Sequence, residues 1–340
     1  MAKTDKIVKW GIVSAGLISH DFVNAIHAFK QQDLNQVIAI AARNLKSAEE
    51  FAQKFDIPKA YEGYEKLAQD PEVQVVYVGS INTTHLEIVK LLLENGKNIL
   101  CEKPLGMNVK EVKEMLDLAK SKNLFLMEAI WSRFQPAYLK LKELIEQKEI
   151  GQVFHVQAEF GMSIQADSDH RVNKKALGGG VCLDIGIYCV QLAQFVFQER
   201  PTKVSSAGHL NADGVDETVC ASFMYSGNRS ASFQFTSRVK STSEAHIYGT
   251  EGKITLKFPF WCTDTLQLKD GSLMEFPLPS GKHEFNFLNS AGLAYEAMHV
   301  RECLVQGLKE SPKLPHQETL LIAELLETIR KEVGVSYQQD

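Results

Sequence analysis

Hydrophobic and polar positions divide the chain into two parts with different periodicity. In the first third, short apolar runs typical of buried strands alternate with amphipathic segments. Ile18, Phe22, Ile26 and Phe29, for example, recur at helical spacing. This alternation predicts a parallel sheet with right-handed crossovers. The expected strands are 7–13, 37–42, 73–78, 98–102 and 124–130, and the expected helices include 85–95 and 109–121.

Local signals mark two helix ends in this part. Ser47 with Glu50 three residues later has the spacing of a capping box, so we expect a helix to start there. Gly96 is placed to end the helix over 85–95.

The pattern changes after about residue 150. A polar, loop-like segment over 165–175 precedes a helix that follows Gly178-Gly179-Gly180. Several strands then follow without intervening helices, which predicts a mostly antiparallel sheet. The expected strands are 153–160, 203–208, 218–225, 229–237, 245–248 and 253–258, and two helices near 296–307 and 317–333 close the chain.

These patterns define the expected fold class. We expect an α/β protein with an N-terminal Rossmann domain, a doubly wound parallel sheet, over residues 1–128. A C-terminal α+β domain with an open, mostly antiparallel sheet should occupy residues 129–340. A length of 340 residues agrees with two domains.

Composition limits the partners. The net charge of −5 lacks the basic footprint of a nucleic-acid-binding protein, so small molecules or other proteins are the expected partners. We find no apolar run near the length of a membrane span and no signal peptide, and so expect no membrane contact. The six cysteines show no Cys-x-x-Cys pairing, which favours reduced thiols and a cytoplasmic location.

The first strand leads into a candidate dinucleotide site at Ser14–Ser19. A Gly-x-Gly-x-x-Gly/Ala fingerprint would place three small residues here, and only the middle one, Gly16, is glycine. The backbone must approach a pyrophosphate closely at that position, and the helix N-terminus at Leu17 and Ile18 would face the phosphates. An ordinary tight turn would also account for one glycine, but the position after the first strand favours a nucleotide.

Arg43 follows the second expected strand. NAD-specific sites usually place Asp or Glu here to bind the ribose 2′-hydroxyl. A guanidinium instead suits a 2′-phosphate, which predicts NADP. A solvated loop residue is the alternative.

Cys101-Glu102-Lys103-Pro104 lies at the end of the strand over 98–102, where ligands bind parallel sheets. Behind a Rossmann start, Glu102-Lys103-Pro104 resembles the Glu-Lys-Pro motif of the glucose–fructose oxidoreductase/inositol dehydrogenase superfamily. Within it, the chain resembles the dimeric dihydrodiol dehydrogenases from about Lys9 to Gln339. The resemblance rests on Trp10–Ser19, Phe125–Phe134, Gly179–Val190, Phe276–Pro279 and Lys309–Pro312.

The resemblance implies an NADP-dependent dehydrogenase that oxidises a trans-dihydrodiol or an aldose such as D-xylose. It also implies that Lys103, Asp184 and Tyr188 are catalytic, with Tyr188 as the acid/base. The spacing of Asp184 and Tyr188 places both on one helix face, although Asp184 could instead orient the helix and Tyr188 pack in the core.

Further contacts carry over from the resemblance. Ser80, Asn82, Glu102 and Lys103 would border the cofactor, beside Ser14, Gly16, Leu17, Ile18 and Arg43. His85, Trp131, Arg133, Phe160 and Trp261 would contact the substrate, although aromatic residues of this kind also serve as core packing. Asn82 stands where the related pattern has a histidine, so the resemblance does not fix the substrate preference.

The resemblance also implies a homodimer that pairs through the C-terminal sheet. Val219, Ala221 and Phe223, or the alternate positions, would form the pairing face. His155, His209 and His283 have no partner at metal-ligand spacing, so we expect no metal. Two alternative functions stay open: another sugar or polyol oxidoreductase of the superfamily, and a non-catalytic NADPH-binding sensor.

Overall fold

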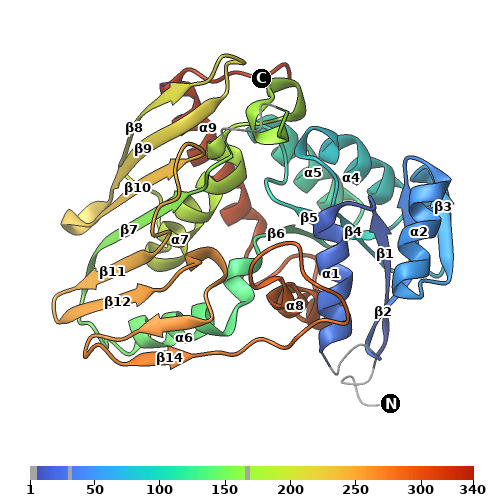
Figure 1. Ribbon diagram of the computed structural model, residues 1–340, viewed down its shortest axis with the longest axis horizontal. Coiled ribbons are helices and arrows are strands. Elements are labelled where there is room, and N and C mark those ends of the chain that lie inside the picture. The colour runs from blue at the N-terminus through green and yellow to red at the C-terminus, as the bar shows by residue number, and fades with distance from the viewer. Residues whose placement is uncertain (1–5, 30–32, 165–168) are drawn as a thin grey trace. The chain divides into compact units, whose positions relative to one another are not determined.

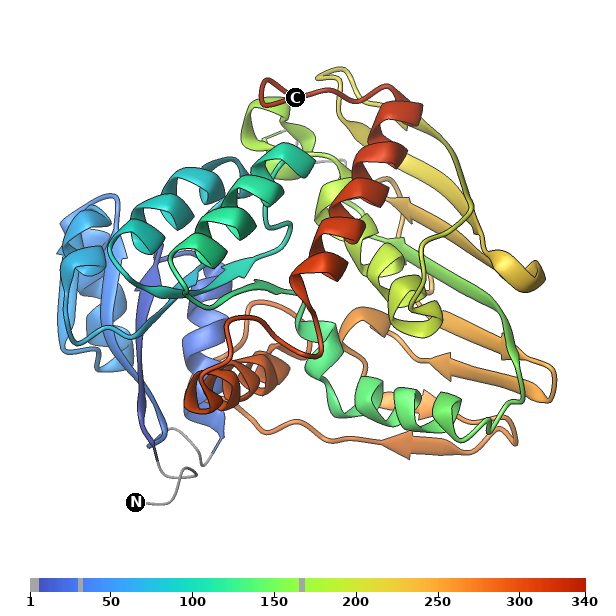
Figure 2. The ribbon, with the colours of Figure 1, turned by 180° about the vertical axis from the view of Figure 1, so that it is seen from behind.

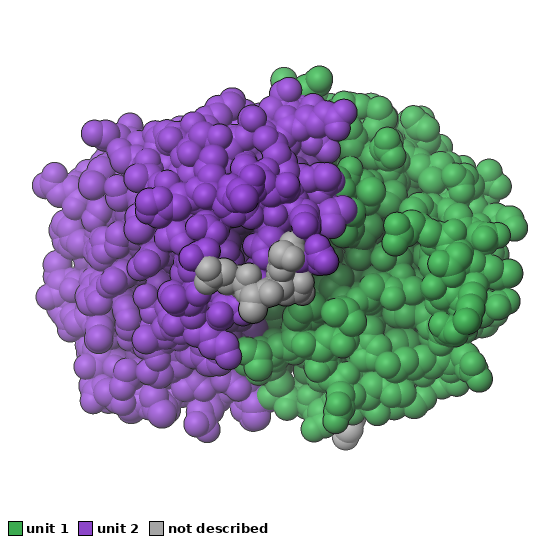
Figure 3. Space-filling model, turned by 45° about the horizontal axis from the view of Figure 1, so that its top comes forward, with its two compact units in different colours: residues 1–106, 110–131, 278–316 green, residues 107–109, 132–277, 317–340 purple. Residues whose placement is uncertain are grey.

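The computed structural model describes residues 6–29, 33–164 and 169–340. It divides into two compact units, coloured separately in Figure 3, and each is described by itself below. Unit 1 comprises Met1–Gly106, Lys110–Trp131 and Leu278–His316, and unit 2 comprises Met107–Val109, Ser132–Pro277 and Gln317–Asp340. The units are therefore discontinuous in sequence, unlike the expected contiguous domains 1–128 and 129–340, because Leu278–His316 returns to the first unit.

Unit 1 is built on a six-stranded parallel sheet, as the sequence predicts (Figure 1). The strand order β3-β2-β1-β4-β5-β6 is that of a doubly wound Rossmann sheet. Central strand β4 is buried along its whole length, because helices cover both faces of a parallel sheet. The strands are β1 (Val8–Val13), β2 (Asn35–Ala42), β3 (Lys59–Glu62), β4 (Val75–Val78), β5 (Asn98–Glu102) and β6 (Leu126–Ala129).

The helices of unit 1 lie on opposite faces of this sheet. The chain adds strands β2 and β3 on one side of β1, and strands β4, β5 and β6 on the other side. Because each crossover is right-handed, this change of direction places α1 and α4 on opposite faces of the sheet. Helix α8 lies beside α1 (Figures 1 and 2). The helices are α1 (Leu17–Ala28), α2 (Leu45–Phe55), α3 (Glu65–Gln69), α4 (His85–Glu94), α5 (Val109–Ser121) and α8 (Leu293–Gln306).

The start of α2 differs from the prediction. The helix begins at Leu45, and the side chain of Asn44 accepts a hydrogen bond from the amide of Ser47 at 2.9 Å. The predicted capping box at Ser47 and Glu50 is therefore wrong, because Asn44, an equally good N-cap residue, starts the helix three residues earlier.

Unit 2 is built on an eight-stranded sheet of order β14-β13-β12-β11-β7-β10-β9-β8. Its neighbouring strands pair antiparallel except β7 and β10, which are parallel. The strands are β7 (Val153–Gly161), β8 (Lys203–Leu210), β9 (Asp216–Met224), β10 (Ser230–Thr236), β11 (Ala245–Gly249), β12 (Gly252–Leu256), β13 (Thr265–Gln267) and β14 (Leu273–Glu275). In this sheet the sequence did not predict the two short strands β13 and β14, which lie at one end of the strand order.

Helices α6 (Pro136–Glu146), α7 (Ile187–Phe197) and α9 (His316–Val333) lie on one face of this sheet (Figure 2). Val219, Ala221 and Phe223 of β9 point into the resulting core and are buried. The alternate residues form the other face, which we call the open face. It is more polar than expected: Cys220 and Gln234 are exposed, and Ser222 and Ser232 are half-buried.

One helical stretch corrects the expectation about membrane spans. Among the described residues, Lys175–Phe197 is long and apolar enough to cross a membrane by length and composition. However, 89% of its apolar window is buried inside the protein, as in the core helix of a globular fold.

Candidate functional site

The turn after β1 has the features of a dinucleotide-binding turn. Gly16 directly precedes α1, and no side chain among the described residues caps this helix start. A Cβ atom at Gly16 would meet nothing closer than Ser14 Oγ at 3.5 Å, so packing within the protein does not require glycine here. Close approach of a ligand to the backbone does explain the glycine, and the uncapped amides at Leu17 and Ile18 suit an anionic phosphate.

Ser14 stands at the first glycine position of the fingerprint. Its φ angle is 79°, in the left-handed region that favours glycine, so the backbone keeps the conformation of the motif without the residue. Leu17 is 62% exposed and Ile18 is half-buried at the start of α1.

Arg43 lies just past the end of β2 and is exposed. The next residue, Asn44, caps α2. Strand β2 pairs in parallel with β1, so the end of β2 lies next to the turn after β1. A guanidinium rather than a carboxylate therefore occupies this position.

The loop after β4 carries Ser80, Asn82 and His85. Ser80 accepts a hydrogen bond from Thr84 Oγ1 at 3.0 Å, and Asn82 Oδ1 accepts one from the amide of Thr83 at 3.1 Å. Asn82 is buried. These contacts shape the short 3-10 turn that leads into α4.

His85 links this loop to the turn after β5. Its Nδ1 lies 2.9 Å from the carbonyl oxygen of Pro104, and its Nε2 lies 3.1 Å from that of Ser80. The ring has no exposed surface, and burial lowers its pKa. This placement lets the imidazole hold the two loops together.

The Glu102-Lys103-Pro104 motif occupies the end of β5. Glu102 is buried; one of its carboxylate oxygens accepts from Tyr77 Oη at 2.5 Å and the other from the amide of Lys103 at 3.2 Å. Lys103 is half-buried, and the Lys103–Pro104 peptide bond is cis. The Glu102 carboxylate thus holds the backbone from which the Lys103 side chain projects.

Asp184 and Tyr188 lie at the start of the core helix of unit 2. Cys182–Gly186 forms a π-helical turn, and α7 begins directly after it. Such turns occur frequently at functional sites, because the wider spacing displaces side chains from the α-helical pattern. Tyr188 is 6% exposed, and Asp184 is half-buried.

Arg171 is a contact that the sequence analysis missed. Its Nη2 lies 2.6 Å from Asp184 Oδ1. The residue lies in the segment 165–175 that the sequence marks only as a polar loop, and no spacing signal pairs it with Asp184. Residues 165–168 of this segment lie outside the described residues.

Aromatic rings gather around Tyr188 in unit 2. Phe160 of β7 and Trp261 stack with ring centroids 3.7 Å apart and an interplanar angle of 14°. The Tyr188 ring lies 6.1 Å from Phe160 and 6.4 Å from Trp261. Trp261 is half-buried, so this cluster presents an apolar ring surface beside the tyrosine.

Two other predicted substrate contacts are buried. Trp131 is 5% exposed, in the 3-10 turn after β6. Arg133 is 3% exposed; its guanidinium lies 2.6 Å from Glu318 and donates to the side chain and backbone of Gln191. These contacts join α7 to the start of α9.

In residues 6–29, 33–164 and 169–340, no group of three or more His, Cys, Asp or Glu residues could hold a metal ion. All six cysteines are free, with Cys220 exposed and the others buried.

The Rossmann sheet, the glycine turn at Gly16 and the Lys103 motif define an oxidoreductase that binds a nicotinamide dinucleotide. Residues 8–130 match the oxidoreductase family with an NAD-binding Rossmann fold, and residues 138–255 match the GFO/IDH/MocA C-terminal domain. The chain therefore belongs to the GFO/IDH/MocA family of oxidoreductases.

Full-length relatives refine this assignment. The chain is 46% identical over 334 residues to trans-1,2-dihydrobenzene-1,2-diol dehydrogenase of Homo sapiens, covering 98% of this chain and 99% of that protein. The enzyme of the same name from Danio rerio is 45% identical, with the same coverage.

Solved structures share the fold. Levoglucosan dehydrogenase in complex with NADH and levoglucosan superposes with a TM-score of 0.83 at 22% identity, over 97% of this chain and 98% of that one. A 3-ketoreductase from Actinomadura kijaniata, in complex with NADP and TDP-benzene, gives a TM-score of 0.80 at 22% identity, over 98% and 99% of the two chains.

Proposed function

We propose that the protein is an NADP-dependent dehydrogenase that oxidises a trans-dihydrodiol or an aldose such as D-xylose. The observation that carries this proposal is the joint presence of Lys103 after β5 and Tyr188 on α7 in a chain 46% identical to a dihydrodiol dehydrogenase over its whole length. Neither residue alone identifies a reaction, but together they supply a cation and a phenol for proton transfer.

The choice of NADP rests on Arg43. The glycine turn at Gly16 and the amides of α1 would hold the pyrophosphate, and Ser80, Asn82 and Glu102 would border the rest of the cofactor. The exposed guanidinium after β2 would pair with a 2′-phosphate, whereas a carboxylate would suit a ribose hydroxyl. When bound, the nicotinamide ring supplies the redox chemistry by accepting a hydride.

Proton transfer falls to the chain's own side chains. The substrate hydroxyl gives its proton to ionised Tyr188 as its carbon becomes a carbonyl carbon. The ammonium of Lys103 holds the same oxygen and favours the phenolate, since a nearby cation stabilises an anion. Asp184 positions the tyrosine. An aldose oxidised at C1 yields a lactone, and a trans-dihydrodiol yields a ketone that tautomerises to a catechol.

The aromatic surface beside Tyr188 supports a ring-shaped substrate. Phe160 and Trp261 offer flat apolar faces, against which either the C–H face of a sugar or a cyclohexadiene ring can pack. Trp131 stays a proposed substrate contact on the resemblance alone. We leave out His85 and Arg133, whose polar atoms contact the protein itself.

We further propose a homodimer that pairs through the open face of the unit 2 sheet. Helices α6, α7 and α9 of unit 2 lie on the opposite face of this sheet (Figure 2). Its serine, glutamine and histidine side chains suit a contact with many hydrogen bonds and bridging waters. A cytoplasmic location agrees with six free thiols.

A substrate panel tests the proposed function. The purified enzyme is incubated with NADP or NAD and with trans-dihydrodiols, D-xylose, other aldoses and inositols, and reduced cofactor is measured by absorbance. We expect the highest kcat/KM with NADP and a dihydrodiol or a pentose. Highest turnover on an inositol would instead favour another polyol oxidoreductase, and tight NADPH binding without any turnover would favour a sensor.

A further inference from the structure

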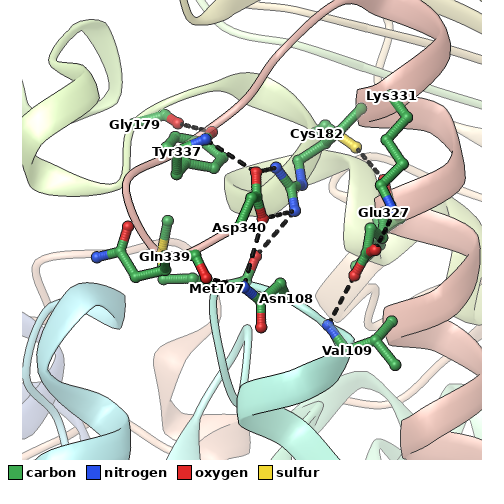
Figure 4. A network of polar contacts seen from close by, with 12 residues as sticks. Met107, Asn108, Val109, Gly179, Cys182, Glu327, Lys331, Tyr337, Gln339 and Asp340 are labelled. Carbon is green, nitrogen blue, oxygen red and sulfur yellow. Dashed lines mark hydrogen bonds and ion pairs between the residues drawn. The ribbon is translucent and has the colours of Figure 1, made fainter.

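The C-terminal residues of unit 2 form a partly buried polar network (Figure 4). Arg330 of α9 is 1% exposed, and its two terminal nitrogens lie 3.0 and 3.1 Å from the two carboxylate oxygens of Asp340. Asp340 also accepts from the amide of Tyr337 at 2.8 Å, and the Arg330 guanidinium lies 4.8 Å from the centre of the Tyr337 ring. We call Arg330, Tyr337 and Asp340 the C-terminal brace.

The brace contacts the glycine turn that precedes the helix of Asp184 and Tyr188. Tyr337 Oη donates to the carbonyl oxygen of Gly179. Gly180 has a φ angle of 112°, and a Cβ atom there would lie 2.9 Å from Tyr337 Oη and 2.4 Å from Asp216 Oδ1. The turn is therefore confined between the tyrosine and a buried carboxyl group, and no larger residue fits at Gly180.

Asp216 binds the backbone of the segment that follows the glycine turn. Its Oδ2 accepts a hydrogen bond of 2.5 Å from the amide of Cys182, the first residue of the π-helical turn. The amide of Asp184 in turn donates to the carbonyl oxygen of Gly180 at 3.3 Å. The path from Tyr337 to the backbone of Asp184 thus consists of direct contacts.

The brace also contacts residues that closely follow Lys103 in the chain. Arg330 Nη2 donates to the carbonyl oxygen of Met107 at 3.1 Å, and Asn108 Nδ2 donates to the carbonyl oxygen of Gln339 at 2.7 Å. The Glu327 carboxylate on α9 accepts from the amide of Val109 at 2.8 Å. Met107–Val109 belong to unit 2, whereas the residues on either side of them belong to unit 1.

We propose that the C-terminal brace positions both halves of the proton-transfer machinery, and that Tyr337 and Arg330 are its positioning residues. It fixes the glycine turn that starts the Tyr188 helix, and it fixes the segment that follows the Lys103 turn. Neither residue touches the substrate. This inference rests on the proposed roles of Lys103 and Tyr188.

Tyr337→Phe tests the brace, because it keeps the ring against Arg330 and removes only the hydroxyl bound to Gly179. We expect kcat to fall by about tenfold, less than the roughly 100-fold loss that a misplacement of about 1 Å can cause. KM for NADP should stay unchanged, because the lost hydroxyl contacts only the glycine turn, whereas the contact of Arg330 with Met107, close to the Lys103 turn, is kept. Hydrogen exchange should become faster at the amides of 180–188 and stay unchanged in the strands of unit 1.

Tyr225→Phe is the matched control. Tyr225 is also buried in unit 2, and its hydroxyl accepts one hydrogen bond, from Gln194 at 3.2 Å, away from the glycine turn. We expect this variant to keep kcat and the exchange rates of 180–188. An equal fall in kcat in both variants, or unchanged exchange at 180–188 in Tyr337→Phe, would overturn the proposal.

The experiment distinguishes a failure of the proposed function from a failure of the brace. If the wild-type enzyme oxidises nothing in the panel, the proposed function fails, and the exchange rates alone still decide whether the brace holds the turn. If Tyr337→Phe does not fold, Asp340→Asn weakens the same network at a carboxylate that is 23% exposed, and the same two measurements apply.

Discussion

Arg171 and Asp184 form an ion pair in unit 2, with 2.6 Å between Nη2 and Oδ1. The Arg171 side chain is 43% exposed, so solvent screens the pair and it contributes at most about 1 kcal/mol to stability. In the proposed function the pair also orients Asp184, because the carboxylate is held by fewer contacts once Arg171 is removed. We expect Arg171→Met to lower kcat by roughly tenfold and to leave the thermal midpoint almost unchanged.

The control for this variant is Arg238→Met. Arg238 pairs with Glu217 at 3.2 Å, and its side chain is 44% exposed, close to the value for Arg171. Kinetics and thermal unfolding of both variants should separate orientation from stability. Equal losses of activity in the two variants would contradict a specific role for Arg171.

Tyr188→Phe removes the proposed acid/base group and keeps its ring beside Phe160 and Trp261. Acid–base assistance is worth roughly 10²–10⁴-fold, so kcat should fall within that range while NADP still binds. Lys103→Met should have a similar effect, and the double variant should be little worse than either alone, since the two residues act as a unit. A folded Tyr188→Phe enzyme with near-normal turnover would assign proton transfer to another group.

Arg43→Ala probes the choice of cofactor. A charged hydrogen bond contributes about 1.5–3 kcal/mol, so affinity for NADP should drop by roughly 10- to 150-fold. Affinity for NAD, which lacks the 2′-phosphate, should change little. Titration calorimetry with both cofactors gives the answer, and equal losses would mean that Arg43 serves the fold instead.

Asp216→Asn should change how stability depends on pH. Burial raises the pKa of Asp216 to about 6, above the usual 3.8, so between these values the folded protein binds more protons than the unfolded chain. Protonated Asp216 stabilises the folded protein fully below pH 3.8. This stabilisation is lost as the pH rises through 6, which lowers the free energy of unfolding by about 3 kcal/mol. The asparagine variant keeps an acceptor for the Cys182 amide and should lack this loss.

Thermal or urea unfolding at pH 4 and pH 7 checks this expectation. Relative to the wild type, the free energy of unfolding of the variant should be higher at pH 7 than at pH 4. A constant difference across the range would show that Asp216 does not titrate in that window.

Gln234→Glu tests the proposed dimer. Gln234 is exposed on the open face, and an isologous contact through this face would bury a new charge from each subunit, which weakens association. The same substitution at Gln53, exposed on α2 of unit 1, is the control. Sedimentation should show a weaker dimer only for Gln234→Glu, and a wild-type monomer at micromolar concentration would rule out the dimer itself.

The hydrophobic pattern predicted most of the helices and strands, because each of them buries either one face or both faces and so repeats its apolar residues regularly. Helix α5 occupies Val109–Ser121 as expected, and β4 is an unbroken apolar run. Short edge strands such as β3 and β14 carry too little apolar patterning to be recognised. The polarity of the open face was also missed, because alternation alone does not say which side of β9 faces the core.

The sequence motifs predicted the positions of single site residues, but they did not predict the contacts between side chains. Gly16 and Lys103 lie at the strand ends where the motifs place them. The ion pair of Arg171 with Asp184 joins residues with no recognisable spacing, so only the folded structure reveals it. His85 is the opposite case: its position in a ligand-binding loop indicated substrate contact, yet both ring nitrogens face backbone carbonyls.

The discontinuity of unit 1 has a consequence for how the chain folds as it is synthesised. Helix α8, which lies beside α1, begins at Leu293, after every strand of unit 2 has been made. At about 5–20 residues per second, the finished Rossmann strands wait roughly 10–30 s for this helix. During that time the nascent chain presents uncovered apolar surface, so a ribosome-bound or truncated N-terminal fragment should be a client of chaperones rather than a stable domain.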